Sequence, residues 1–171
     1  LAARGTRLVL VDVDEAGLAS VEQELAEAVV LARRVDVSDE GAMKKLADEV
    51  HEIAGALDVL VNNAGVGLGG GMLDTPLEAW DWVLRINLWG VIHGCHLFVP
   101  RMAERGAGHV VNVSSALGYF ATGKTAGYAT SKFAVFGLSE SLRAELAPKG
   151  VGVSTICPGI IDTPIVKTGR Y

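Results

Sequence analysis

The sequence predicts an α/β protein built on a doubly wound parallel sheet with helices on both faces. Two observations carry this prediction. Short apolar runs rich in β-branched residues alternate with segments of helical length along the chain, the pattern of strand–helix units joined by crossovers. At 171 residues, 50% of them hydrophobic, the chain is also long enough to bury one core. We find no repeat, low-complexity tract or linker in the sequence, so we expect a single domain over residues 1–171.

Five runs are expected to be strands. Each is apolar over about four to six residues, as strands buried on both faces of a parallel sheet are. They cover residues 7–12, 29–36, 57–63, 109–115 and 151–159.

Four segments between these runs are expected to be helical. They cover residues 14–28, 38–55, 75–106 and 127–150. In the second segment, apolar residues recur at helical spacing and Gly55 marks the end. The third segment opens at Pro76 and stops at Gly106, and it is either one long helix or a broken pair.

The composition argues against several classes of partner. The formal net charge is −5, from 20 acidic and 15 basic residues without a basic stripe, so nucleic acid is not an expected partner. No apolar run reaches the roughly 18 residues that span a bilayer, and the N-terminal stretch lacks the pattern of a secretory signal. We therefore expect a cytoplasmic protein without a membrane partner. Cys95 and Cys157 lie far apart without CxxC or Cys/His spacing, which predicts two buried thiols and no metal site.

Small or polar residues follow every predicted strand. Ligands of such sheets gather at the carboxyl ends of the strands, so these positions are the first candidates for a site. They are Asp12, Asp36, the run 62–65, Ser114 with Ser115, and Pro158 with Gly159. Taken one at a time, each also has a structural explanation as a helix cap or a turn residue.

Tyr128 and Lys132 are separated by four residues on a predicted helix, so they share one face. A phenol has a pKa near 10, and a nearby ammonium favours the phenolate, which brings the group closer to a useful range for proton transfer. Ser115, at a strand end, can hydrogen-bond a carbonyl oxygen held by the same tyrosine. Tyr128 is therefore a candidate general acid/base. An isolated pair of this spacing is also typical of a solvated helix edge.

The motifs together resemble the short-chain dehydrogenase/reductase family. The likeness runs through nearly the whole chain, in the order and spacing of that family. It rests on Asp12, "DVS" at 36–38, "NNAG" at 62–65, "INLWG" at 86–90, "VNVSS" at 111–115, "YATSK" at 128–132 and "PGIIDT" at 158–163.

This resemblance implies a Rossmann-like fold and an NAD(P)-dependent oxidoreductase that interconverts an alcohol and a ketone or aldehyde. It assigns the proton transfer to Tyr128, the nicotinamide ribose and the lowering of the tyrosine pKa to Lys132, and the substrate oxygen to Ser115. Asn87 corresponds to an asparagine that holds a water in the proton relay. Ser114 is the rival for the serine role, and the family spacing favours Ser115.

The resemblance also implies the residues that contact the cofactor. They are Asp12, Asp36, Val37, Asn63, Ala64, Gly65, Tyr128, Lys132, Pro158, Gly159, Ile161 and Thr163. A carboxylate at Asp12 accepts hydrogen bonds from the ribose hydroxyls of NAD and repels the 2′-phosphate of NADP. No arginine follows within three residues, so we expect NAD rather than NADP.

The sequence departs from the family at both ends. It has no TGxxxGxG phosphate loop, and the glycine cluster at 65–72 does not open a helix in a strand–helix–strand unit. The family's substrate-covering segment after the "PG" motif is also missing. We therefore expect the middle of a longer catalytic domain, incomplete at both ends.

Two alternatives stay open. One is a noncatalytic fragment or binding protein that kept the fold without holding cofactor, and the other is an epimerase or dehydratase of the extended relatives. Residues near 66–72 and 116–121 are small, aliphatic or aromatic, which favours a hydrophobic alcohol or ketone as substrate. The aromatic residues of segments 75–106 and 127–148 favour a homodimer or homotetramer.

Overall fold

The computed structural model describes residues 2–163, 165 and 169–170. Strands and helices alternate along it as the sequence predicts. The strands are β1 (Leu8–Asp12), β2 (Val29–Arg34), β3 (Val59–Asn62), β4 (Gly108–Val113) and β5 (Val151–Ile156). The helices are α1 (Glu15–Glu24), α2 (Glu40–Ala54), α3 (Leu77–Leu84), α4 (Gly90–Arg105) and α5 (Ala126–Leu146). Shorter helical turns are η1 (Ala2–Arg4), η2 (Arg85–Trp89), η3 (Ala116–Gly118) and η4 (Ala147–Lys149).

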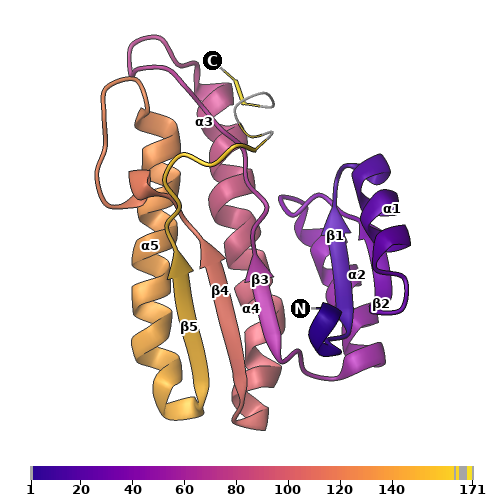
Figure 1. Cartoon of the computed structure of the whole chain (residues 1–171). Coiled ribbons are helices and arrows are strands. Elements are labelled where there is room, and N and C mark those ends of the chain that lie inside the picture. Colours follow the sequence, from indigo (N-terminus) through magenta and orange to yellow (C-terminus); the bar gives the residue numbers. More distant parts are fainter. Residues whose placement is uncertain (1, 164, 166–168, 171) are drawn as a thin grey trace.

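All pairings between the named strands are parallel, but they form two sheets where the sequence suggests one. β1 pairs with β2, and β3, β4 and β5 pair in that order. Figure 1 shows the β1–β2 pair standing beside the three-stranded sheet. Within the described residues no strand hydrogen-bonds both β1 and β3, so each of them is an edge strand on that side.

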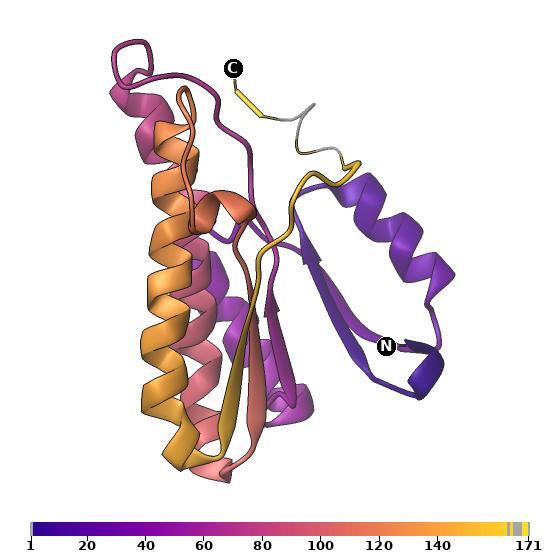
Figure 2. The ribbon, with the colours of Figure 1, turned by 60° about the vertical axis from the view of Figure 1, so that its left-hand side comes forward.

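The helices cover the faces of the two sheets unequally. α1 packs on one face of β1–β2, whereas α2, α4 and α5 lie on the opposite side of the molecule (Figure 2). Alternate residues of β3 and β5 therefore point away from the helices, and Val59, Val61 and Ile156 are 46%, 49% and 48% exposed. No helix in the described part of the chain is long and apolar enough to cross a membrane.

One hydrophobic core joins the two sheets despite the missing pairing. It runs from Leu31 on β2 through Leu60 on β3 and Val110 on β4, and Met102 and Val135 close it from α4 and α5. Burying a side chain of this size contributes about 1.5–3 kcal/mol. Packing along the helix layer thus holds β1–β2 in place without a hydrogen-bonded ladder between the sheets.

The third predicted helix is one helical run with a wider turn inside it. α3 passes into the π-helical turn η2 and then directly into α4. A π turn of this kind inserts a residue into the α-helical ladder and re-aims the side chains around it, and such turns are common at functional sites. Asn87 sits in this turn and is fully buried.

Side chains at the helix ends account for where α1 and α2 begin and stop. The Asp14 carboxylate accepts hydrogen bonds from the backbone of Ala16 and Gly17 at the start of α1, and Asp39 accepts one from Ala42 at the start of α2. Gly55 ends α2 with a φ of 67°, which glycine adopts without steric cost. The stop predicted from Gly55 is confirmed.

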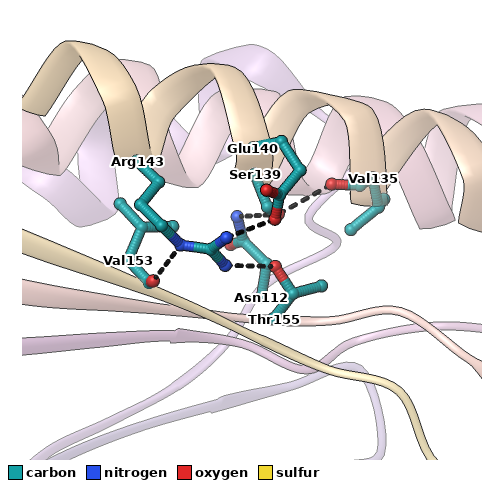
Figure 3. Close-up of polar contacts among 7 residues, drawn as sticks. All are labelled: Asn112, Val135, Ser139, Glu140, Arg143, Val153 and Thr155. Atoms are coloured by element: carbon teal, nitrogen blue, oxygen red, sulfur yellow. Dashed lines mark hydrogen bonds and ion pairs between the residues drawn. The ribbon is translucent and has the colours of Figure 1, made fainter.

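Polar side chains tie α5 to the sheet. Ser139 Oγ accepts a hydrogen bond from Asn112 Nδ2 at 2.9 Å and donates one to the Val135 carbonyl at 2.7 Å (Figure 3). Arg143, one turn further along, donates to the Val153 carbonyl of β5 at 3.0 Å and pairs with Glu140. These contacts tie the part of α5 beyond Lys132 to β4 and β5.

Candidate active site

The candidate site lies at the carboxyl ends of the strands. β3 leads into the run 62–65, β4 into Ser114 and Ser115, and β5 into the segment 157–159, while the first turns of α5 carry Tyr128 and Lys132. The three parallel strands place their ends at one edge of the sheet, as Figure 1 shows. The structure thus brings together residues that are as many as 97 positions apart in the sequence, from Asn62 to Gly159.

Lys132 is the most buried charged residue of this site. Lys132 is only 3% exposed, and its Nζ donates a hydrogen bond to the Val113 carbonyl at 3.0 Å. Burial lowers the pKa of Lys132 to about 8, and the Coulombic influence of Cys157 opposes that shift. The ammonium lies 5.8 Å from the centroid of the Tyr128 ring, so the two residues share one helix face as the spacing predicts.

Tyr128 is half-buried between α5 and the α3 region. Its ring packs against a second apolar cluster formed by Leu68, Ala79 and Val83. These contacts restrict the ring, and the Lys132 ammonium lies 5.8 Å from its centroid. The phenol is therefore held in a defined place by packing, which is a requirement for a group that exchanges protons with a bound substrate.

Asn87, in the π turn, hydrogen-bonds two separate segments of the site. Its Oδ1 accepts from the Val66 backbone N–H at 2.8 Å, and its Nδ2 donates to the Val66 carbonyl and to Ser131 Oγ, each at 3.0 Å. Ser131 Oγ in turn donates to the Tyr128 carbonyl at 2.7 Å. Both amide hydrogens of Asn87 are thus engaged in holding the loop after β3 and the second turn of α5.

Gly65 passes directly beside these groups. A Cβ atom at this position would lie 3.3 Å from Asn87 Oδ1 and 3.4 Å from Lys132 Nζ. A Cβ here would press on Asn87 Oδ1 and would be in ordinary van der Waals contact with Lys132 Nζ. The glycine of the "NNAG" motif therefore lets the backbone pass close to both residues.

The two adjacent serines have different surroundings. Ser114 is 3% exposed, and its Oγ donates to the Lys132 carbonyl at 2.8 Å. Ser115 is half-buried, and its Oγ accepts from the Leu117 backbone N–H at 3.2 Å as the cap of η3. In the bond with Leu117 the Ser115 hydroxyl only accepts, so it can still donate a hydrogen bond to another partner. The Ser114 hydroxyl already donates to the Lys132 carbonyl.

The residues expected to contact adenine and its ribose also lie at strand ends. Asp12, Asp36, Asn63 and Ala64 are exposed there, on the ends of β1, β2 and β3. Asp12 Oδ1 accepts from the Asp14 backbone and Asp36 Oδ1 from the Ser38 backbone, which orients both carboxylates. Val37 is instead a packing residue, since a Cβ on Gly90 would lie 2.6 Å from its Cγ2. Exposed carboxylates with oriented oxygens are suitable acceptors for hydrogen bonds from ribose hydroxyls.

The segment after β5 is the last predicted part of the site. The Pro158 carbonyl accepts from the Ala116 backbone N–H at 2.8 Å, which joins this segment to η3. Gly159, Ile161 and Thr163 are exposed. These three residues lie beyond the end of β5, after the contact of Pro158 with η3.

Two backbone amides of the glycine cluster at 65–72 are already engaged. Gly69 N–H donates to the Arg170 carbonyl at 2.8 Å, and Gly70 N–H donates to the Lys124 carbonyl at 2.9 Å. At the start of α1, the first amides are capped by Asp14. The amides of Gly69, Gly70, Ala16 and Gly17 are therefore not available to a pyrophosphate.

Comparison with known proteins decides the family. The family model described as short chain dehydrogenase matches residues 1–170. This chain belongs to the short-chain dehydrogenase family. The match includes every residue discussed above, from Asp12 to Thr163, and confirms the resemblance seen in the motifs.

Three similar proteins show how far the likeness extends. The chain is 45% identical over 99% of its length to a probable oxidoreductase, EphD, of Mycobacterium tuberculosis, of which it spans 29%. It is 39% identical over 96% of its length to a 3-alpha-(or 20-beta)-hydroxysteroid dehydrogenase of Mycobacterium bovis, of which it spans 63%. A short-chain dehydrogenase/reductase of Burkholderia phymatum in complex with NAD matches 98% of this chain and 61% of its own, with 38% identity and a TM-score of 0.92.

Two features of this short-chain dehydrogenase site are not apparent from motif reasoning. Cys157 is only partly buried, so the prediction of two buried thiols is correct for Cys95 alone. A hydrogen bond with Cys157 raises the pKa of Tyr119, whose ring also packs edge-on against Phe136. Cys157 directly follows β5 and precedes Pro158, and this position at a strand end could have predicted that Cys157 belongs to the candidate site. Ser131, inside "YATSK", is the second feature, because its pairing with Asn87 spans 44 positions.

The described residues contain no group of three or more His, Cys, Asp or Glu that could hold a metal ion.

Proposed function

We propose that the protein containing this chain is a nicotinamide-dependent oxidoreductase that interconverts an alcohol and a ketone or aldehyde, with Tyr128 as the general acid/base. The observation that carries this proposal is the buried Lys132 ammonium beside the Tyr128 ring, with Nζ 5.8 Å from the ring centroid. A buried ammonium does not stabilise the packing of the protein, because removing the charge from water costs free energy. A role in proton transfer at Tyr128 would explain why a lysine is buried here.

The proton transfer follows from the charges of these two residues. With a pKa of about 8, Lys132 is roughly nine-tenths protonated at pH 7. The positive charge favours the ionised form of Tyr128 over the neutral phenol. In oxidation Tyr128 Oη removes the hydroxyl proton of the alcohol, and in reduction it returns a proton to the carbonyl oxygen. The nicotinamide, when bound, accepts or supplies the hydride.

Ser115 is the residue we assign to the substrate oxygen. The Ser114 hydroxyl donates to Lys132 inside the protein, which supports Ser115 as the serine that faces the substrate. Its Oγ is oriented by the Leu117 amide and can donate its proton outward. Together with Tyr128 Oη, it would hold the reacting oxygen at two points.

The residues around Asp12 favour NAD over NADP. Asp12, Asp14 and Glu15 form an acidic end to β1, and the Arg34 guanidinium opposite Asp12 lies 3.5 Å from Glu15 Oε1. The net negative charge would attract the ribose hydroxyls as hydrogen-bond donors and repel a 2′-phosphate. Asp36, Asn63, Ala64 and Gly65 would then hold the adenine and its ribose, with Pro158, Gly159, Ile161 and Thr163 on the nicotinamide side.

A hydrophobic alcohol or ketone is the substrate class we propose. Met72, Leu73, Tyr119 and Phe120 are all exposed at this end of the molecule, and each is more than half exposed. Apolar side chains gathered at the mouth of a site favour an apolar ligand. The relative named as a hydroxysteroid dehydrogenase supports the same class.

A self-association through α4 and α5 is the oligomeric state we propose. A groove between these helices is lined by apolar residues that include Ile92, Val99, Leu138 and Leu142. Trp89 and Phe133 lie on the same two helical segments and are 51% and 42% exposed. Light scattering on the intact protein at micromolar concentration should give the mass of a dimer or tetramer, and a monomeric mass would contradict this part of the proposal.

Steady-state kinetics with Tyr128→Phe tests the function. We expect turnover to fall to about 1% of wild type or less, with NAD binding within twofold of wild type, because only the proton-transferring hydroxyl is lost. Tyr119→Phe is the matched control, since it removes a phenolic hydroxyl from the same end of the molecule and should leave most of the turnover intact. Full activity of Tyr128→Phe would contradict the role of Tyr128, whereas a wild-type protein without turnover would support the alternative in which the fold serves binding without catalysis.

A further inference from the structure

Ser114 joins three elements at the candidate site. Its backbone N–H donates to the Ile156 carbonyl at the end of β5 at 2.8 Å, and its Oγ donates to the Lys132 carbonyl on α5 at 2.8 Å. Ser114 itself follows directly on β4. A residue that is 3% exposed therefore links β4, β5 and α5 at one point.

Lys132 is bound at both of its ends by consecutive residues of the same strand end. Its Nζ donates to the Val113 carbonyl at 3.0 Å, and its own carbonyl accepts from Ser114 Oγ. The strand end thus holds the backbone and the ammonium of one lysine at once. Because Tyr128 lies one helical turn before Lys132, this double contact also sets the position of the phenol relative to Ser115.

Gly118 shows how closely this contact is packed. A Cβ atom at Gly118 would overlap Ser114 Oγ and would lie 3.0 Å from the Lys132 carbonyl oxygen. The turn η3, which Ser115 caps, therefore rests directly on the Ser114–Lys132 hydrogen bond. Movement at this bond would be passed to Ser115 on one side and to Lys132 on the other.

We propose that Ser114 is a positioning residue for proton transfer: its hydrogen bond to the Lys132 carbonyl holds α5 at the separation from β4 at which the Lys132 ammonium acts on Tyr128. This rests on the function proposed above. In this role Ser114 acts through Lys132 and not by contact with substrate or cofactor. Its hydroxyl is needed because it donates the hydrogen bond to the Lys132 carbonyl.

A buried serine elsewhere on α5 provides the matched control. Ser139 is 0% exposed and also ties α5 to β4, through Asn112, two turns beyond Lys132. Ser139→Ala removes one buried hydroxyl from the same interface without touching the backbone of Lys132. This variant shows how far turnover depends on α5–β4 packing that does not involve Lys132.

The test compares pH profiles of kcat in the intact protein. For Ser114→Ala we expect kcat to fall at least fivefold, the KM for NAD to stay within twofold, and the apparent pKa of the acid limb to rise, because the ammonium acts on Tyr128 from further away. For Ser139→Ala we expect kcat within twofold of wild type and an unchanged pH profile. Identical profiles for the two variants would overturn the proposal.

Two further measurements keep the result interpretable. Ser114→Cys keeps the shape of the side chain but donates weakly, so it should shift the pKa of the acid limb in the same direction and by less; an unshifted profile would count against the proposal even where Ser114→Ala does not fold. Tyr128→Phe separates the two claims. If Tyr128→Phe stays active, the proposed function fails, whereas an inactive Tyr128→Phe with an unshifted Ser114 variant overturns only the role of Ser114.

Discussion

Asn87 Nδ2 donates to Ser131 Oγ at 3.0 Å, and this bond joins the π turn of η2 to the second turn of α5. Both residues are 0% exposed. Because Ser131 Oγ also bonds the Tyr128 carbonyl, a residue between α3 and α4 takes part in placing Tyr128. The stability of the fold and the geometry of the candidate site therefore depend on the same buried contacts.

Removing the Asn87 amide should destabilise the protein strongly. Asn87→Ala leaves the Val66 backbone groups and Ser131 without their partner, and each buried unsatisfied group costs about 1–3 kcal/mol. We expect the free energy of unfolding to fall by about 2–5 kcal/mol in urea denaturation. The control is Asn63→Ala, an exposed asparagine of the neighbouring loop, which should change it by about 0.5 kcal/mol or less. Equal effects of the two substitutions would refute this view of Asn87.

Lys132 should reduce the stability of the protein at neutral pH, although catalysis by Tyr128 depends on its charge. Its pKa is lowered from 10.5 to about 8, so the unfolded chain binds the proton more tightly than the folded one. Stability linked to this group is therefore lowest below about pH 8 and rises as the pH increases toward 10.5. We expect Lys132→Met to abolish turnover yet to raise the free energy of unfolding at pH 7 by an amount on the order of 1–3 kcal/mol. Thermal melts at pH 7 and pH 10 check it, with the exposed Lys149→Met as control; a lower melting temperature of Lys132→Met at pH 7 would be the contrary result.

His51 should make the protein sensitive to acid. Burial lowers the pKa of His51 from 6.5, the Arg101 charge lowers it further, and Asp48 opposes both. Its Nε2 is buried without a hydrogen-bond partner among the described residues, beside a cavity of about 720 Å³ that Arg101, Glu104 and Arg105 also line. The folded state thus favours the neutral ring, and its stability falls as the pH drops below 6.5 through the folded pKa.

The measurement for His51 is the melting temperature between about pH 5 and pH 8, the range in which histidines titrate. We expect the melting temperature of His51→Gln to decrease less steeply with falling pH than that of wild type, because the group that gains a proton on unfolding is gone. His96→Gln, on the exposed side of α4, is the control and should leave the slope unchanged. A slope that is as steep in His51→Gln as in wild type would rule out this histidine as the cause.

Asp12 should decide the choice of cofactor. Asp12→Ala removes a carboxylate that would bind the ribose hydroxyls and repel a 2′-phosphate, so the KM for NAD should rise about tenfold and the preference for NAD over NADP should shrink by more than that. Kinetics with both cofactors measure the two effects separately. Asp14→Ala is not a clean control because it uncaps α1, but Glu22→Ala lies on the same helix and should change neither value. An unchanged ratio in Asp12→Ala would contradict the assignment.

The strands and helices could be predicted because each depends on a short stretch of sequence. The apolar runs around Leu10, Leu31, Leu60, Val110 and Val153 all became strands, within a few residues of the expected bounds. The end of α2 at Gly55 followed from local conformational preference alone. Motif spacing likewise placed Tyr128 and Lys132 on one face, because the period of a helix is the same in any protein.

Features that depend on distant partners could not be predicted in this way. The division into two sheets depends on which strands meet, and the apolar pattern of β1 or β3 does not specify a neighbour. The π turn at η2 leaves no mark in the apolar periodicity, since the helix continues on both sides. The different surroundings of Ser114 and Ser115 arise from α5, whose carbonyl at Lys132 reaches only one of them.

The most direct test of the account is a single-turnover measurement of hydride transfer with Tyr128→Phe and Lys132→Met in the intact protein, using NAD and a hydrophobic secondary alcohol. If Tyr128 exchanges the proton and Lys132 lowers its pKa, both variants should lose about a hundredfold or more in the rate of reduced nicotinamide formation. Tyr128→Phe should still bind NAD as wild type does, and raising the pH should recover part of the rate in Lys132→Met alone, as Tyr128 ionises without help. Hydride transfer at the wild-type rate in Tyr128→Phe would contradict the account.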